Sequence, residues 1–202
     1  MKRLFLLVLA AACLCAANAH ADGDPASDYL YGQQVFFPFN VNIPKEKQQS
    51  FTALLAATNR SGYKIRVALI ASTYDLGAVT ALWRKPREYA RFLDAEIQFV
   101  YKHRLLVVMP NGFGFAWPHH SSRREYALLG KIPIESDGVG LVDAAETAVR
   151  TLAKASGVTI GATQPLPSPS RRNAHDRAVI VLVAVAVFAI AVLLRLALRH
   201  RR

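Results

Sequence analysis

The central part of the chain switches between helical and extended hydrophobic patterns. Apolar residues recur every three or four positions after Pro44, which predicts a helix that ends at Gly62. The same spacing predicts helices over about residues 86–101 and 139–155. The run 65–71 predicts a strand, and 105–109 predicts a strand that is apolar on both faces. Strands that alternate with helices indicate an α/β domain whose sheet is covered by helices on both faces.

The segment LLVVMPNGFGFAWPHH, residues 105–120, combines a turn sequence with candidate chemistry. Asn111-Gly112 between two apolar runs predicts a β-hairpin with a type I′ turn, which requires a positive φ at both residues. Gly114, inside the second strand of this hairpin, indicates a bulge or an edge strand. The hairpin adds an antiparallel strand, so the predicted sheet is mixed. No helix begins directly after the glycines and no G-x-x-x-x-G-K pattern is present, which excludes a phosphate-binding loop of that kind.

Both ends of the chain carry apolar segments of another kind. A basic start, an apolar stretch and the motif Ala19-His20-Ala21 predict a signal peptide over residues 1–21, and acylation of Cys13 in a lipoprotein is the alternative. Residues 178–198 predict a transmembrane helix, and 199–202 a basic cytoplasmic tail. The Pro/Ser-rich stretch 163–177 predicts a stalk, which leaves residues 22–162 as an extracytoplasmic domain.

The distribution of charge argues against a nucleic-acid partner. The chain has 25 Lys+Arg and 14 Asp+Glu, for a net charge of +11. When Lys2, Arg3 and all residues from Arg171 onward are left out, 16 basic and 13 acidic residues remain. The excess of positive charge therefore flanks the two apolar segments at the ends. Both cysteines fall in the predicted signal peptide, so the mature domain has no thiol or disulfide, and we expect no cofactor.

Four residues are candidates for binding a ligand or partner: Asp75, Trp117, His119 and His120. Asp75 follows the strand 65–71, where open α/β sheets bind ligands, but an aspartate there can also turn the chain through local backbone bonds. His119 and His120 are neighbours in an extended segment and point to opposite sides, which disfavours a shared metal and leaves an exposed polar loop as the alternative. We predict no catalytic and no metal-binding residue. A weak metal-assisted phosphatase-like activity that uses Asp75 and His119 or His120 is the alternative function.

Two further polar residues are predicted to be buried. Glu96 falls within the apolar stripe of the helix 86–101, between Phe92 and Val100. An unpaired buried carboxylate is costly, so Glu96 must either pair with a cation or reach the edge of the stripe. Arg66, on the strand 65–71, is the predicted partner, and the pair is expected to be structural.

Four segments in this order resemble the TPM domain: IRVALIASTYDLGAV, PREYARFLDAEI, RLLVVMPNGFGF and DGVGLVDAAETAVRTLA. This extracytoplasmic module is named for thylakoid-lumen, photosystem-assembly and levamisole-receptor accessory proteins, and the resemblance covers about residues 35–157. It implies a TPM-like mixed sheet, a tether of one C-terminal helix, and a role in membrane-complex assembly, receptor modulation or phosphatase chemistry. The chain departs from the family after the hairpin, where Ala116–Ser121 replaces a Gly-rich turn with following acidic residues; this puts any carried-over metal or phosphatase residues in doubt.

The predicted protein is therefore a single-pass cell-membrane protein with its N-terminal domain outside and its C-terminus in the cytoplasm. The lipid bilayer is the expected partner of the C-terminal helix. The domain is expected to act as an interaction or accessory module for a membrane or envelope protein.

Overall fold

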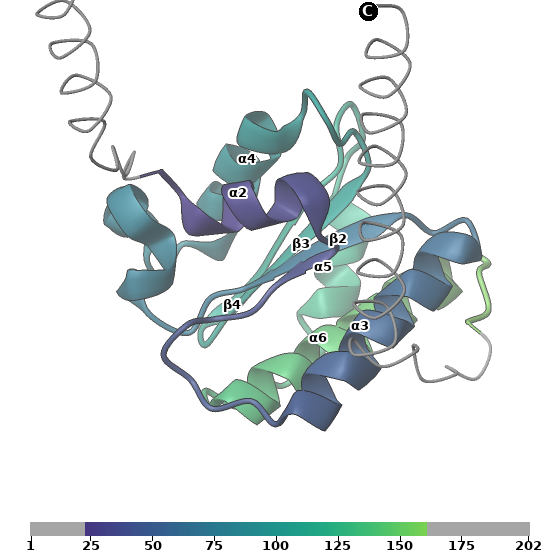
Figure 1. Cartoon of the computed structure of the whole chain (residues 1–202). Coiled ribbons are helices and arrows are strands. Elements are labelled where there is room, and N and C mark those ends of the chain that lie inside the picture. Colours follow the sequence, from purple (N-terminus) through teal and green to yellow (C-terminus); the bar gives the residue numbers. More distant parts are fainter. Residues whose placement is uncertain (1–22, 161–202) are drawn as a thin grey trace, which may run out of the picture. The chain divides into compact units, whose positions relative to one another are not determined.

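The sheet has four strands in the order β1-β2-β3-β4, namely Val35–Phe36, Ile65–Leu69, Arg104–Met109 and Gly112–Ala116. The computed structural model describes residues 23–160 (Figure 1). The first three strands are parallel and β4 is antiparallel to β3, which confirms the mixed α/β sheet. The helices are α2 (Pro25–Gly32), α3 (Lys45–Arg60), α4 (Pro86–Ile97), α5 (Arg123–Leu129) and α6 (Gly138–Ala155), and a 3-10 segment η1 spans Thr73–Leu82.

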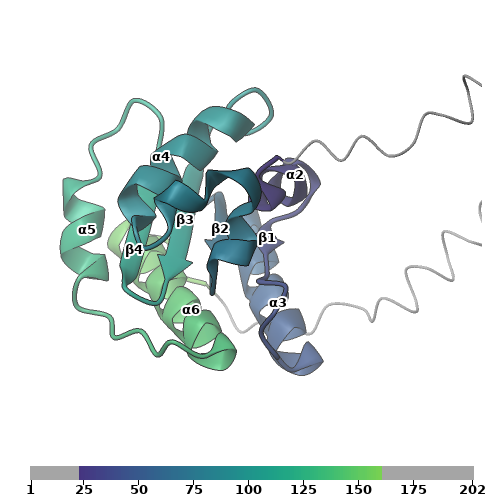
Figure 2. The same ribbon diagram turned by 90° about the vertical axis from the view of Figure 1, so that its left-hand side faces the viewer.

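Helices cover both faces of the sheet (Figures 1 and 2). Leu106 and Val108 of β3 pack in the core with α3, α5 and α6, whereas Leu105, Val107 and Met109 pack in a second core with α2, η1 and α4. This confirms that β3 is buried on both faces. The helix α3 connects β1 to β2, and α4 connects β2 to β3, which are successive neighbours in the sheet. Because α3 and α4 lie on opposite faces, these two parallel connections have opposite hands. One of them therefore departs from the usual right-handed rule.

The hairpin is present, but its predicted turn type is wrong. The two loop residues are Pro110 and Asn111, because Met109 pairs with Gly112. Neither loop residue has a positive φ, whereas Gly112, the first residue of β4, has a φ of 152°. The proline ring fixes φ near −65°, which excludes a type I′ turn in this register. The predicted edge position is confirmed, since β4 is the last strand of the sheet.

A buried carboxylate joins α2 to α4. Asp24, the N-cap residue of α2, is 5% exposed, and its Oδ1 accepts a 2.6 Å hydrogen bond from the Tyr89 hydroxyl of α4. Its Oδ2 has no hydrogen-bond partner among the residues that the structure describes. Burial raises the pKa of Asp24 to about 6, and the hydrogen bond from Tyr89 opposes this rise. The ionisation of Asp24 therefore makes the stability of the folded domain depend on pH.

The predictions for the two ends of the chain fall outside the described residues. These are the signal peptide 1–21, the stalk 163–177, the transmembrane helix 178–198 and the tail 199–202. Within residues 23–160, no helix combines the length and the apolar character needed to cross a membrane.

Candidate functional site

Asp75 holds the turn after β2. Its side chain is fully buried, and its carboxylate accepts bonds of 2.9 Å from the backbone N–H groups of Phe39, Ala71 and Ser72. The Ser72 hydroxyl donates a fourth bond at 3.3 Å. The carboxylate thus fixes three backbone segments at the carboxyl end of β2. This geometry matches the turn-forming alternative rather than a ligand site.

Trp117 and His120 belong to a stack of rings and a guanidinium group. The imidazole of His120 lies parallel to the indole of Trp117, with 3.6 Å between centroids, and its Nδ1 is 2.8 Å from the carbonyl oxygen of Pro118. The Arg104 guanidinium lies 3.8 Å from the Trp117 centroid and 4.2 Å from that of Tyr63. At these distances His120 and Arg104 must occupy opposite faces of the indole. The cation and rings attract each other, which fixes the chain after β4.

The structure does not bring Asp75 together with the histidines. Asp75 follows the carboxyl end of β2. His119 and His120 follow β4, whose last residue Ala116 pairs with Leu105 near the start of β3. Since β2 and β3 are parallel, the histidines lie at the amino ends of these strands, whereas Asp75 lies at their carboxyl ends. The structure therefore does not place Asp75 in one site with either histidine. Within residues 23–160 there is also no group of three potential metal-ligating side chains.

The predicted pairing of Arg66 with Glu96 is wrong. Glu96 is exposed, and the described residues contain no ion pair between it and Arg66. Arg66 is half-buried as predicted, but its guanidinium lies 4.1 Å from the ring centroid of Tyr101 and donates to the Leu30 carbonyl. Burial lowers the pKa of Arg66. The helix ends at Ile97, so Val100 does not extend the apolar stripe and Glu96 falls at its exposed side.

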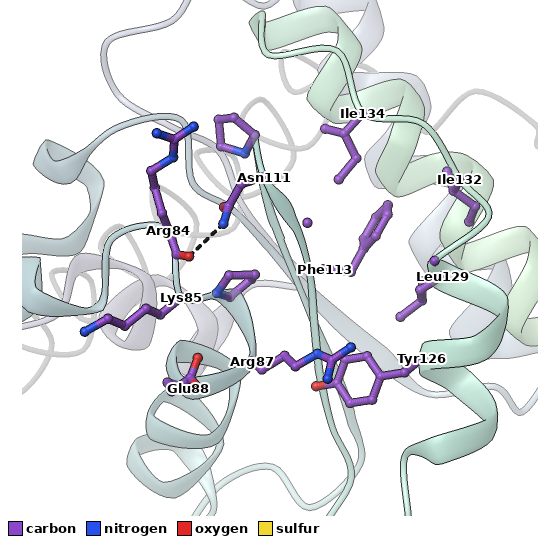
Figure 3. A pocket seen from close by; sticks show the side chains of 14 residues that line it. Arg84, Lys85, Arg87, Glu88, Asn111, Phe113, Tyr126, Leu129, Ile132 and Ile134 are labelled. Carbon is purple, nitrogen blue, oxygen red and sulfur yellow. Dashed lines mark hydrogen bonds between the residues drawn. The ribbon is translucent and has the colours of Figure 1, made fainter.

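A cleft of about 570 Å³ opens at the carboxyl end of β3 (Figure 3). It lies between the start of α4, the β3–β4 loop, and α5 with the segment that follows it. The residues that line it are Arg84, Lys85, Pro86, Arg87, Glu88, Pro110, Asn111, Gly112, Phe113, Tyr126, Leu129, Gly130, Ile132 and Ile134. Three separate stretches of the sequence thus form one concave surface.

Close backbone contacts position the cationic wall of the cleft. The Asn111 side chain donates a 2.6 Å hydrogen bond to the Arg84 carbonyl, and Arg84 has a φ of 59°, in the left-handed region. The start of α4 lies directly against β4, because a side chain at Gly114 would overlap the Pro86 carbonyl and lie 2.8 Å from Cβ of Ala90. Gly114 is therefore required for this close approach.

The cleft carries an excess of positive charge beside an apolar wall. Arg84, Lys85 and Arg87 have no ion-pair partner among the described residues, and Glu88, the one carboxylate of the lining, lies 3.7 Å from Arg91. The Arg87 guanidinium lies 4.3 Å from the ring centroid of Tyr126. On the other side, the wall consists of Phe113, Leu129, Ile132 and Ile134 (Figure 3). The cleft therefore fits a ligand that is both anionic and apolar.

A second cleft, of about 690 Å³, is lined by aromatic side chains. Tyr29, Phe39 and Tyr74 are 50%, 45% and 65% exposed, and Phe39 contacts each of the two tyrosines edge to face. Gly23, the first residue that the structure describes, also lines this cleft. The first cleft, which contains Arg84, Lys85 and Arg87 and is called the cationic cleft below, lies well inside the described range and is the candidate site that we consider further.

Sequence reasoning missed the cationic cleft. The run Arg84-Lys85-Pro86-Arg87 was available as a local cluster of charge before a helix. This cluster forms part of a cleft only because Tyr126 and Ile132, which are far away in the sequence, form the opposite wall. Among the predicted site residues, the structure stacks Trp117 on His120. No protein-family model, no curated protein and no solved structure matches this chain.

Proposed function

We propose that this chain is a single-pass membrane protein whose extracytoplasmic, TPM-like domain binds a negatively charged segment of a membrane or envelope protein in the cationic cleft, as an accessory module of a membrane complex. The observation that carries the proposal is the set of three unpaired cations, Arg84, Lys85 and Arg87, beside an apolar wall. Charges of one sign that line a concave surface attract and orient a ligand of the opposite sign.

The polar groups of the cleft favour binding over catalysis. The Tyr126 hydroxyl accepts a 2.9 Å hydrogen bond from the Phe115 N–H and donates a 3.0 Å bond to the Phe115 carbonyl. The Asn111 amide is bound to the Arg84 carbonyl. Both side chains hold the backbone in place, whereas none of the three cations has an ion-pair partner among the described residues, although Arg87 lies against the Tyr126 ring.

A photo-crosslinking amino acid in place of Ile134 tests this function in intact cells. We expect a discrete crosslinked product with a second membrane or envelope protein, which is lost when Lys85→Glu is added. Lys102→Glu is the matched control, because it makes the same charge change at an exposed residue outside the cleft. A product that persists in the Lys85→Glu variant, or no product from Ile134, would refute binding in the cleft.

A further inference from the structure

The free edge of β4 faces the cationic cleft at Phe113. Along an antiparallel strand, every second residue directs its N–H and C=O away from the partner strand. Phe115 does so, because both of its backbone groups bond to the Tyr126 hydroxyl. Phe113, two residues earlier, must therefore also direct its N–H and C=O outward. These two groups have no hydrogen-bond partner among the described residues.

The α5 helix limits how much of the edge is open. Tyr126 occupies the edge at Phe115, so a strand added to β4 can pair only at the hairpin end. At that end Phe113 and Gly112 line the cleft. An unpaired backbone N–H and C=O at an edge strand provide two hydrogen bonds to an extended peptide.

The two sides of this edge have different chemistry. Phe113 packs in the core with α3, α5 and α6, on the side of Ile132 and Ile134. The start of α4, with Arg84 and Lys85, lies on the opposite side of β4 (Figure 3). Successive side chains of an extended peptide point to opposite faces. A peptide paired with Phe113 would thus present one side chain to the cations and the next to the isoleucines.

We infer, on the basis of the proposed function, that the bound segment of the partner is an extended strand with alternating acidic and apolar residues, which pairs with the backbone of Phe113. The rest of this chain is a poor occupant, because residues 161–202 contain seven arginines and a single acidic residue, Asp176. A second copy paired edge to edge would bring two sets of Arg84, Lys85 and Arg87 together. A partner of opposite charge avoids both repulsions.

Fluorescence anisotropy with the purified full chain in detergent micelles tests the inference. The probe is a labelled eight-residue peptide that alternates glutamate and valine. Two further probes have the same residues, one N-methylated on alternate backbone amides and one with four glutamates followed by four valines; in a third, lysine replaces glutamate. We expect the alternating peptide to bind and the lysine peptide not to bind. The N-methylated and block peptides should bind at least about tenfold more weakly than the alternating peptide, since the first loses backbone pairing and the second loses alternation.

Protein variants and hydrogen exchange separate the two levels of the proposal. Lys85→Glu should lower the affinity for the alternating peptide severalfold, and Lys102→Glu should not. The bound peptide should also slow hydrogen exchange of the Phe113 amide. Equal affinity for the alternating, N-methylated and block peptides, together with sensitivity to Lys85→Glu, would overturn strand pairing and leave the proposed function standing. Failure of every acidic peptide to bind would overturn both.

Discussion

Replacement of Asp24 by asparagine should change how the stability of the domain depends on pH. Burial raises the pKa of this carboxyl from 3.8 to about 6, so the folded domain holds the proton more tightly than the unfolded chain. The stabilising contribution of the protonated group is complete below pH 3.8 and is lost as the pH rises through about 6. Above that pH the full cost of the buried charge remains.

The magnitude follows from the size of the shift. About two pKa units at roughly 1.4 kcal/mol each give a cost of about 3 kcal/mol for the ionised group at neutral pH. Asparagine keeps an acceptor for the Tyr89 hydroxyl and cannot ionise. Its Nδ2 takes the place of the unpartnered Oδ2, and this effect does not vary with pH between 4 and 7. The free energy of unfolding of the Asp24→Asn variant relative to the wild type should therefore increase by about 2–3 kcal/mol from pH 4 to pH 7.

Urea unfolding of the full chain in detergent, followed by tryptophan fluorescence, measures this difference. Both tryptophans, Trp83 and Trp117, lie in the described domain, so the signal reports on its unfolding. Asp28→Asn is the matched control, since it removes the same charge from the exposed face of α2 and should change stability by less than about 0.5 kcal/mol. A difference between the Asp24→Asn variant and the wild type that is equal at pH 4 and pH 7 would refute the argument.

Three further predictions concern packing and topology. Gly114→Ala should destabilise the domain by about 3 kcal/mol or more, because the methyl group overlaps the Pro86 carbonyl, whereas Gly32→Ala, with open space around it, should change the urea midpoint little. Tyr126→Phe should cost about 1–2 kcal/mol and speed hydrogen exchange at Phe115, since both backbone bonds are lost; unchanged exchange would contradict this. Protease added to intact cells or spheroplasts should digest the domain and leave a small C-terminal membrane fragment, and protection of the whole chain would contradict the predicted orientation.

Local hydrophobic spacing was enough to predict α3, α4, α6 and the strands β2 and β3, whereas β4 was predicted from the Asn111-Gly112 turn signal between two apolar runs. Each element predicted from its spacing has a regular apolar face of its own, and the structure buries that face in the core. The segments α2 and η1 were not predicted, because α2 is only eight residues long and η1 changes direction at Gly77, which has a φ of 52°. Short or kinked elements carry no sustained periodicity.

The candidate site was less predictable because it depends on which segments meet. Asp75 was placed correctly after β2, but only the three-dimensional structure shows that Phe39 completes its hydrogen bonds. Glu96 was misplaced because the helix was extended past Ile97. The cleft combines Arg84 with Ile134, fifty residues away in the sequence, and no local pattern relates them.

The arrangement around β4 joins protection of an edge strand with selection of a ligand. An exposed edge invites pairing with any extended chain, and proteins commonly guard such edges with charged side chains. Here Tyr126 closes the edge at Phe115, and the three cations stand beside the part that stays open at Phe113. Those cations repel a second copy of the domain, which carries the same charges, and attract an acidic strand. Because the same charges do both, charge reversal in the cleft should weaken binding of the acidic peptide and, at the same time, remove the repulsion that opposes self-association through β4.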